Sequence, residues 1–547
     1  MFSLPYESIK ALLFCHERPK MPFRGRKSPQ NSATNGLKYH FVAKKCPKIL
    51  PRKDNLLILW QIKIVMHMAE IVGRKYEIAE LEKLYHSKKA EFVVVYGRRR
   101  IGKTFLVRNL FEDRITFLHT ALSPSEFEDD KLVDLQLRAF YVSLQNYGAD
   151  MDHAPSDWFE AFQFLQKLIS SKHEHSASRL VVFIDELPWM DVKGSGFVTA
   201  FEHFWNNWAS AQDYLMLVVC GSATTWINDK ILNNYGGLYG RITAEILLAP
   251  FTLKECEQYF ESQSVVMNRY DQVQCYMITG GIPYYLSLIN PGLSLAQNID
   301  ALFFTKSGRL RLEFDRLMNS LYSSPESYSK VLRFLSTKRK GFTRKEIADA
   351  TGLPYGGALT IVLKGLETSS FIEPYLYYNG SKRNIHYRLI DSFVLFYMTF
   401  VDGKEGTSPT FWSDSQLLPS IQAWRGFSFE GVCIAHIEAI KRSLGITGVR
   451  TNQAPWFSKE NDPAVQIDLV IDRADRVINL CEMKFSINDF EVTKKYDAEL
   501  RNKVATFIDE TKCKKSVHTT LVTTYGLKRN SYSGFFQNVI TMDDLFQ

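Results

Sequence analysis

The chain has 547 residues, of which 45% are hydrophobic and 23% are charged. A chain of this length is too long to fold around one ordinary hydrophobic core, so three or four domains are expected. The composition excludes a peptide, a fibre and a fully disordered protein. No stretch of about eighteen residues is both apolar and uncharged, so we predict no membrane-spanning helix.

The formal net charge of +8 comes from one end of the chain. Residues 1–70 hold 13 Lys and Arg against 4 Asp and Glu, and the rest is close to neutral. The net charge therefore does not indicate a nucleic-acid partner. Residues 1–68 lack a clear signal-peptide core and cleavage site, so we predict a basic, poorly ordered extension. One alternative is a targeting segment; another is a translation start at Met66 or Met68, which would leave residues 1–65 untranslated.

The eight cysteines include no Cys-x-x-Cys pair. This spacing favours neither a zinc site nor a redox dithiol. We therefore expect a reducing, cytoplasmic compartment, with cysteines serving as small core residues.

A phosphate-binding motif follows the predicted strand 91–96. A predicted helix, 105–111, comes directly after it, and this strand, loop and helix context is the one that the motif GxxxxGK[ST] requires. The motif consists of Gly97, Arg98, Arg99, Arg100, Ile101, Gly102, Lys103 and Thr104. Its backbone amides are expected to hold the phosphates of ATP, with Lys103 adding a positive charge and Thr104 binding Mg²⁺.

Two carboxylates end a second predicted strand, 179–186. Asp185 is expected to bind Mg²⁺ through water and Glu186 to act as general base, because ligands lie at the carboxyl ends of parallel strands. The alternative is that the acidic pair caps a helix. The segment before this strand has room for a strand at 114–120 and helices at 126–147 and 156–172, as a P-loop sheet requires.

Two further polar residues are candidates for contact with the γ-phosphate. Ser222 follows a predicted strand, 214–220, and is expected to sense this phosphate. Arg241 precedes a predicted strand, 242–248, and is expected to reach the γ-phosphate of its own or a neighbouring subunit. The alternative for Arg241 is a solvated or capping role.

Several short segments together resemble a known family. They are Ile71-Val-Gly73-Arg74-Lys-Tyr-Glu77, the P-loop with its arginine run, Phe183-Ile-Asp-Glu-Leu-Pro-Trp189, Cys220-Gly-Ser222, Tyr239-Gly-Arg241, Leu248-Ala-Pro-Phe251 and Thr279-Gly-Gly-Ile-Pro-Tyr-Tyr285. They look like the prokaryotic AAA-type ATPases of the DEXX-box class, and the resemblance extends to the C-terminus. It implies that Arg74 lies beside the adenine or the phosphates and that the Gly-Gly-Ile-Pro segment belongs to a helical lid. No second lid arginine stands out, so that sensor role is unassigned.

The middle of the chain has the pattern of a winged helix-turn-helix. Helices are predicted at 328–336, 343–351 and 355–368, followed by a hairpin at 372–389 with an Asn-Gly turn. The third helix would be the recognition helix, but it offers one cation, Lys364, and also carries Glu367. DNA contact would then depend on cations outside that helix, and the alternative is a protein-docking or interdomain element. These cations are Lys338, Arg339, Lys340, Lys382 and Arg383.

Carboxylates also converge in the C-terminal part. A helix is predicted at 420–443, and strands at 466–471 and 476–485 are joined by a turn. The second strand places Glu482 and Lys484 on one face, and the turn could bring Asp468 beside them. Two carboxylates can hold a hard cation, while a lysine can orient water for attack on a phosphodiester.

This arrangement resembles the PD-(D/E)XK nuclease superfamily. Asp468, Glu482 and Lys484 match its signature, and Glu430 matches the acidic residue of its first helix. A domain of this type ends many of the ATPases that the upstream segments resemble. The alternative is a hairpin edge whose charges prevent strand-to-strand aggregation.

The prediction is a multidomain α/β protein. Its expected parts are a P-loop parallel-sheet ATPase over 69–250, a helical lid over 251–322, a winged helix over 323–395 and a restriction-endonuclease-like α/β domain over 396–547. ATP and Mg²⁺ are the expected ligands, with DNA as a candidate partner of the last two parts. The alternative is an ATP-switched regulatory protein without nuclease activity. Oligomerisation is open.

Overall fold

The computed structural model describes residues 71–123, 129–175, 178–222, 224–233, 236–338, 340–381, 384–404, 406–458 and 465–547. The predicted extension, 1–68, and the predicted DNA-contacting cations Arg339, Lys382 and Arg383 lie outside these residues. No helix within the described ranges is long and apolar enough to cross a membrane.

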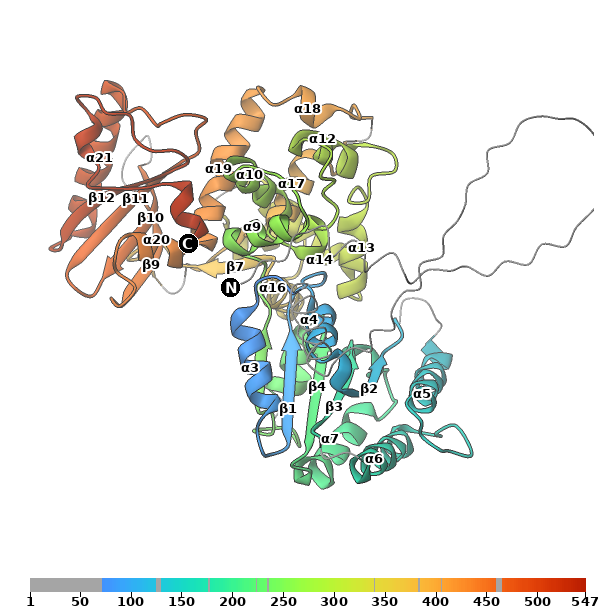
Figure 1. The fold of residues 1–547 in the computed structure, drawn as a ribbon. Helices are drawn as coiled ribbons and strands as arrows, with labels where there is room; N and C mark the ends of the chain where they lie inside the picture. The colour runs from blue at the N-terminus through green and yellow to red at the C-terminus, as the bar shows by residue number, and fades with distance from the viewer. Residues whose placement is uncertain are drawn as a thin grey trace, which may run out of the picture. The chain divides into compact units, whose positions relative to one another are not determined.

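The first part of the chain builds a five-stranded parallel sheet in the order β2-β3-β4-β1-β5 (Figure 1). The strands are β1 (Glu91–Tyr96), β2 (Ile115–Thr120), β3 (Leu180–Asp185), β4 (Leu215–Gly221) and β5 (Ala244–Leu247). All five strands were predicted, within about two residues at each end. Parallel pairing makes the ends of β1, β3 and β4 meet at one edge of the sheet, which brings their following loops together.

Helices cover both faces of this sheet, and the residues of its central strands are therefore buried on both sides. On one face, Val93 and Val95 pack in a core shared with α3 (Lys75–Tyr85) and α4 (Lys103–Leu110). On the other face, the alternate residues of the strands pack in a core shared with three helices. These are α5 (Asp129–Asn146), α6 (Trp158–Glu174) and α7 (Phe197–Asn207). The continuous apolar strands therefore follow from burial between two helical layers.

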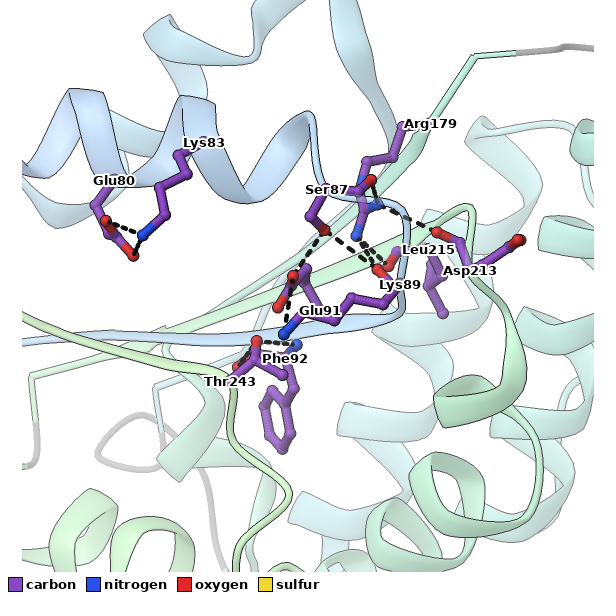
Figure 2. A network of polar contacts seen from close by, with 10 residues as sticks. All are labelled: Glu80, Lys83, Ser87, Lys89, Glu91, Phe92, Arg179, Asp213, Leu215 and Thr243. Carbon is purple, nitrogen blue, oxygen red and sulfur yellow. Dashed lines mark hydrogen bonds and ion pairs between the residues drawn. The ribbon is translucent and has the colours of Figure 1, made fainter.

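The amino ends of the strands are tied together by polar contacts (Figure 2). The guanidinium of Arg179 donates to four backbone carbonyls, those of Ser87, Lys89, Asp213 and Leu215. At the same edge, Phe92 N–H donates to Thr243 Oγ1 at 3.0 Å, and Thr243 N–H donates to Phe92 O. These contacts fix the edge of the sheet that lies opposite the P-loop.

Helices follow the first sheet. They are α9 (Leu253–Ser262), α10 (Arg269–Thr279), α11 (Pro283–Leu286), α12 (Leu295–Ile299), the π-helix η6 (Asp300–Phe304) and α13 (Glu313–Leu321). Helix α9 begins with a capping box in which Thr252 Oγ1 accepts Glu255 N–H and the Glu255 carboxylate accepts Thr252 N–H. The Gly-Gly-Ile-Pro segment, 280–283, joins α10 to α11. Gly281 has a φ of 68°, and a β-carbon there would lie 2.3 Å from Phe251 O, so only glycine fits.

The three helices and the hairpin of the middle part lie where the sequence predicted them, whereas the short strand β6 was not predicted. The elements of this part are α14 (Pro325–Leu335), β6 (Phe342–Thr343), α15 (Arg344–Thr351), α16 (Gly357–Thr368), β7 (Ile372–Tyr375) and β8 (His386–Leu389). Strands β7 and β8 pair antiparallel, and β8 also pairs with the short β6. Helix α15 begins with a capping box that Thr343 and Glu346 form. Helix α17 (Ser392–Phe400) follows, with Asp391 as its cap.

The C-terminal part is a second α/β layer with sheet order β13-β12-β11-β10-β9. Its elements are α18 (Phe411–Asp414), α19 (Pro419–Ala435), α20 (Ile437–Ser443), β9 (Thr451–Phe457), β10 (Gln466–Arg473), β11 (Val477–Lys484), α21 (Lys494–Thr511), β12 (Ser516–Thr523) and β13 (Asn538–Ile540). Strands β9 to β11 are antiparallel, whereas β11, β12 and β13 are parallel, with α21 as the crossover from β11 to β12. Figure 1 shows α21 beside this sheet. Phe507 of α21 packs in a core with side chains of β9, β10 and β11.

The predicted single helix over 420–443 is wrong, because the chain breaks between α19 and α20 at His436. This residue has φ −109° and ψ 30°, outside the helical range. Its Nε2 accepts the N–H of Leu253 at 2.9 Å, at the start of α9, and Nδ1 faces Val432 O at 2.8 Å. A long-range contact to α9 therefore accompanies the break in the helical pattern.

Candidate functional site

The P-loop connects the carboxyl end of β1 to the amino end of α4, as its motif predicted. Gly97 has a φ of 143°, and a β-carbon at this position would lie 2.5 Å from Leu248 O, so only glycine fits. The Lys103 ammonium donates to the carbonyls of Gly97 and Arg98 at 3.1 Å each. Burial lowers the pKa of Lys103, and the nearby charge of Glu186 opposes this. The lysine is thus held inside the loop where phosphates would lie.

Thr104 and Asp185 meet at the start of α4. Thr104 Oγ1 donates to Asp185 at 2.9 Å from Oδ2 and 3.1 Å from Oδ1, and Cys220 Sγ lies 2.6 Å from Oδ1. A hydroxyl and a carboxylate so placed are oxygen ligands of the kind that Mg²⁺ takes beside phosphates. The donor set therefore fits a magnesium ion held by Thr104 directly and by Asp185 directly or through water.

Glu186 lies one residue beyond Asp185 and is held by Ser222. The Glu186 carboxylate accepts the Ser222 hydroxyl at 3.0 Å and the Ser222 N–H at 3.1 Å. Glu186 has a φ of 51°, a left-handed backbone conformation that is strained for a residue with a β-carbon. The structure therefore brings together the predicted general base and the predicted phosphate sensor.

The arginine side chains of the P-loop turn toward distant parts of the chain. Arg98 pairs with Asp391, with 3.0 Å between Nη2 and Oδ2, and both side chains are buried. Arg100 donates to Glu313 at 2.8 Å from Oε2, and Glu313 is also buried. The guanidinium of Arg99 lies 5.9 Å from the ring centre of Trp189. The side chains of Arg98 and Arg100 thus bind carboxylates from later parts of the chain.

The predicted nucleotide contact Arg74 is committed to the backbone around the P-loop. Its guanidinium donates to Ile101 O at 3.2 Å and to Ala249 O at 2.7 Å, and it lies over the ring of Phe251. Burial lowers the pKa of Arg74, and the charge of Glu255 opposes this. Arg74 therefore positions the P-loop through the Ile101 carbonyl.

The structure does not bring Arg241 to the P-loop. Its neighbour Thr243 is bonded to Phe92, at the amino end of β1, whereas the P-loop leaves the carboxyl end (Figure 2). A strand rises about 3.3 Å per residue, so most of β1 lies between Arg241 and the phosphates. The exposed Arg241 side chain therefore does not fit a contact with its own subunit's nucleotide. A contact with a neighbouring subunit stays a prediction.

Comparison with known proteins agrees with this geometry. Residues 71–289 match a family described as an ATPase domain predominantly from Archaea. These residues form an archaeal-type ATPase domain. The ATPase domain includes the P-loop, the acidic pair, Ser222 and the first helices of the predicted lid.

Relatives and solved structures extend the comparison. The chain is 25% identical over 436 residues to the uncharacterized protein MJECL04 of Methanocaldococcus jannaschii, which covers 78% of this chain and 90% of that protein. It is 42% identical over 43 residues to the uncharacterized ATP-binding protein MJ0423 of the same organism, 8% of this chain and 73% of that protein. The Walker-type ATPase PABY2304 of Pyrococcus abyssi aligns with a TM-score of 0.43 and 18% identity, over 60% of this chain and 96% of that chain.

A second candidate site lies downstream of the ATPase domain, between β10 and β11. These strands pair with Leu469 opposite Cys481, which places Asp468 beside Glu482, and Asp468 Oδ2 accepts the N–H of Met483 at 3.0 Å. Lys484 Nζ lies 2.7 Å from Glu482 Oε1. Asp468, Glu482 and Lys484 are thus adjacent, as the sequence predicted.

The electrostatics of the two carboxylates differ. Burial, with the charge of Glu482 added, raises the pKa of Asp468 to about 6. Burial would also raise the pKa of Glu482, but the ammonium groups of Lys484 and Lys503 hold it below its ordinary value. The ammonium groups therefore favour the charged form of Glu482, whereas burial beside that charge disfavours the charged form of Asp468.

Glu430 approaches this site from α19. A cavity of about 40 Å³ is lined by Glu430 and Asp468, and a groove of about 750 Å³ leads to Asp468 from the β7–β8 hairpin. Among the residues that the structure describes, no three or more His, Cys, Asp or Glu side chains form a group that could hold a metal ion. Mg²⁺ commonly takes one or two carboxylates and completes its shell with water and phosphate. Asp468 and Glu482 fit that smaller donor set.

Sequence reasoning missed the partners that α21 supplies to Glu482. Tyr496 donates to Glu482 Oε1 at 2.6 Å, and Lys503 Nζ lies 3.0 Å from Oε1 and 2.9 Å from Oε2. Asp391 and Glu313, which bind the P-loop arginines, were missed as well. One signal was available for Lys503, because a helix that crosses between parallel strands must pack on the sheet that carries Glu482.

Proposed function

We propose that the ATPase domain binds ATP at residues 97–104 and hydrolyses it to ADP and phosphate. The observation that carries this proposal is the grouping of Lys103, Thr104, Asp185, Glu186 and Ser222 at one edge of the sheet. The loop amides and Lys103 would bind the β- and γ-phosphates. When bound, Mg²⁺ would neutralise phosphate charge, and Thr104 with Asp185 would hold it.

Glu186 is proposed to accept the proton of the attacking water. A base must lie within hydrogen-bond reach of the water, and Ser222 limits where the Glu186 carboxylate can point. When the Glu186 carboxylate turns toward the attacking water, the Ser222 hydroxyl would contact the γ-phosphate and so sense it. Proton acceptance at Glu186 and phosphate contact at Ser222 would therefore be linked.

Calorimetry with Mg-ATP tests nucleotide binding. The native chain is expected to release heat at a single site per chain. Lys103→Ala is expected to release none, because the substitution removes the buried ammonium that lies inside the loop. Lys83→Ala is the matched control, since Lys83 is exposed and pairs with Glu80 on the surface of α3. Equal heats from the native chain and Lys103→Ala would remove the assignment.

We also propose a metal-dependent phosphodiester site at Asp468, Glu482 and Lys484, acting on DNA. Support comes from the adjacency of two carboxylates and a lysine on paired strands. Asp468 and Glu482 would hold the cation, and Lys484 would orient the attacking water. Glu430 lines the same cavity as Asp468 and would act on the cation's hydration shell rather than bind it directly.

Plasmid incubated with Mg²⁺ or Mn²⁺ tests this site. Cleavage is expected from the native chain and is expected to be lost in Asp468→Ala. Asp475→Ala is the control, because Asp475 lies exposed in the turn after β10 and bonds to Arg473. Absence of cleavage with and without ATP would favour a regulatory protein without nuclease activity.

A second candidate function, an ATP-controlled switch, is favoured by the contacts of α16. The ammonium of Lys364 lies 2.7 Å from Asp229, and Thr368 bonds to Thr225 at 2.9 Å, in the segment that follows Ser222. The predicted recognition helix thus uses its cation on the ATPase domain. This supports the interdomain alternative over DNA contact by that helix.

The connection between β7 and β8 contacts the C-terminal sheet. Tyr378 N–H donates to Pro455 O at 2.9 Å, on β9, and the Tyr378 hydroxyl donates to Asp472 at 3.2 Å, on β10. The middle part of the chain, α14 to β8, would therefore transmit structural changes at Ser222 to the groove that ends at Asp468. Hydrogen exchange of residues 372–381 is the test: exchange that changes with ATP in the native chain but not in Lys364→Met supports the switch, and identical exchange in all states contradicts it.

A further inference from the structure

Glu482 is surrounded by cationic and hydroxyl donors from two elements. Lys484 reaches it from the same strand, while Tyr496 and Lys503 reach it from α21. The Lys503 ammonium contacts both carboxylate oxygens, at 2.9 and 3.0 Å, and the side chain is about one quarter exposed. Glu482 itself is buried. Both of its oxygens are therefore occupied by donors.

A divalent cation needs the same oxygens. Carboxylate ligands of Mg²⁺ or Mn²⁺ bind through lone pairs, and an ammonium that uses both oxygens competes directly for them. Lys503 sits on a flexible stem that reaches solvent, so it can withdraw without unfolding α21. Lys484 Nζ contacts Glu482 Oε1 at 2.7 Å, and its side chain is about one third exposed.

We infer that Lys503 is a positioning residue that occupies the cation side of Glu482 and must be displaced when a divalent cation binds. This inference rests on the proposed metal-dependent site. Displacement would free the Lys503 ammonium beside Glu482, where it can pair with a phosphate oxygen of a phosphodiester. The cation and the substrate phosphate would then bind together better than either binds alone, because each takes one partner of the Lys503–Glu482 pair.

Substitutions at residue 503 give opposite predictions. Lys503→Met keeps an unbranched side chain of similar length and removes the charge. Mn²⁺ affinity is therefore expected to rise by about tenfold, which corresponds to the loss of one competing charged hydrogen bond. Lys503→Arg is expected to weaken Mn²⁺ binding, because a guanidinium binds a carboxylate through two parallel hydrogen bonds. If Lys503 had only a structural role, the Mn²⁺ affinity would not decrease in the order Met, Lys, Arg at residue 503.

The experiment is Mn²⁺ titration of the full chain by calorimetry at pH 7.5, without nucleotide. The Asp468→Asn variant gives the background of Mn²⁺ binding at all other sites, including Asp185. Lys495→Met is the matched control, since Lys495 lies on α21 but is exposed and faces Glu499. Its Mn²⁺ affinity is expected to equal that of the native chain.

Two failures are distinguishable. Identical titrations of the native chain and Asp468→Asn would remove the metal site itself. A native site that is lost in Asp468→Asn but has the same affinity in Lys503→Met and Lys503→Arg would overturn the role of Lys503 and leave the metal site standing. Affinities in the order Met, Lys, Arg, from tightest to weakest, would support it.

Discussion

Arg98 of the P-loop and Asp391 at the start of α17 form a buried ion pair, with 3.0 Å between Nη2 and Oδ2. Asp391 also accepts the N–H of Val394 at 2.8 Å and so caps α17. Burial raises the pKa of Asp391, and the positive charge of Arg98 opposes this. The loop that is proposed to hold ATP is thereby fixed to a helix from the second half of the chain.

Replacement of Asp391 is expected to damage both stability and nucleotide binding. Asp391→Asn leaves Arg98 buried without its counter-charge, which costs about 3–5 kcal/mol when one partner of a buried pair is removed. We expect a lower thermal-unfolding midpoint and weaker ATP binding by fluorescence titration. Asp402→Asn is the control, because its pair with Arg333 is largely exposed and worth less than about 1 kcal/mol. Unchanged ATP affinity in Asp391→Asn would show that the P-loop does not depend on this pair.

Ser222 is expected to act on turnover rather than on binding. Ser222→Ala removes the hydroxyl that orients Glu186, and misplacement of a catalytic group by about 1 Å costs roughly 100-fold in rate. We expect Ser222→Ala to turn over ATP more slowly than the native chain, by roughly one to two orders of magnitude, with unchanged affinity for Mg-ATP. Ser222→Thr keeps the hydroxyl and should recover most of the rate. A loss of ATP affinity with normal turnover would contradict this role.

Arg241 provides a test of subunit contact. Because it lies at the amino end of β1, Arg241→Ala is expected to leave Mg-ATP affinity unchanged. Turnover should fall only at protein concentrations at which chains associate, measured by phosphate release over a dilution series. Loss of affinity at high dilution would mean that Arg241 reaches its own subunit's nucleotide after all.

The elements of the ATPase domain were predictable because each strand is a short run rich in apolar residues, and the candidate site residues lie at or just after a strand end. Asp185 and Ser222 end neighbouring strands of a parallel sheet, so their convergence follows from topology. The partners of Arg98 and Arg100 were not predictable, since Asp391 and Glu313 lie far along the chain and no local pattern marks them. The break at His436 has the same origin, because a tertiary hydrogen bond from Leu253 acts on it.

The C-terminal site was partly predictable. The turn between the two strands sets the antiparallel register, which brings Asp468 to Glu482. The sequence pattern did not give the α21 residues that face Glu482, because a helical lysine such as Lys503 ordinarily lies in solvent. Only packing of α21 on the sheet turns that lysine toward a carboxylate.

Because His119 is buried, we expect acid to lower the folding stability of the ATPase domain. Its ring is buried on β2, with Nδ1 2.9 Å from Ser143 Oγ, and burial lowers the pKa of His119 to about 4. The unfolded chain therefore binds this proton more readily, so stability is lost as pH falls from about 6.5 toward 4, by as much as about 3 kcal/mol.

Thermal unfolding of the ATPase domain across this pH range measures the effect. The midpoint should fall less steeply with acid in His119→Leu than in the native chain. His175→Leu, at an exposed position, should behave like the native chain. Parallel acid profiles for the native chain and His119→Leu would contradict the assignment.

The most direct test of ATP hydrolysis is phosphate release by the native chain and by Glu186→Gln under saturating Mg-ATP. The amide keeps the shape of the side chain but cannot accept the proton of the attacking water, so turnover should fall at least about 100-fold while ATP binding is kept. Phosphate release at the native rate by Glu186→Gln would contradict the general-base role and, with it, the proposed catalytic site.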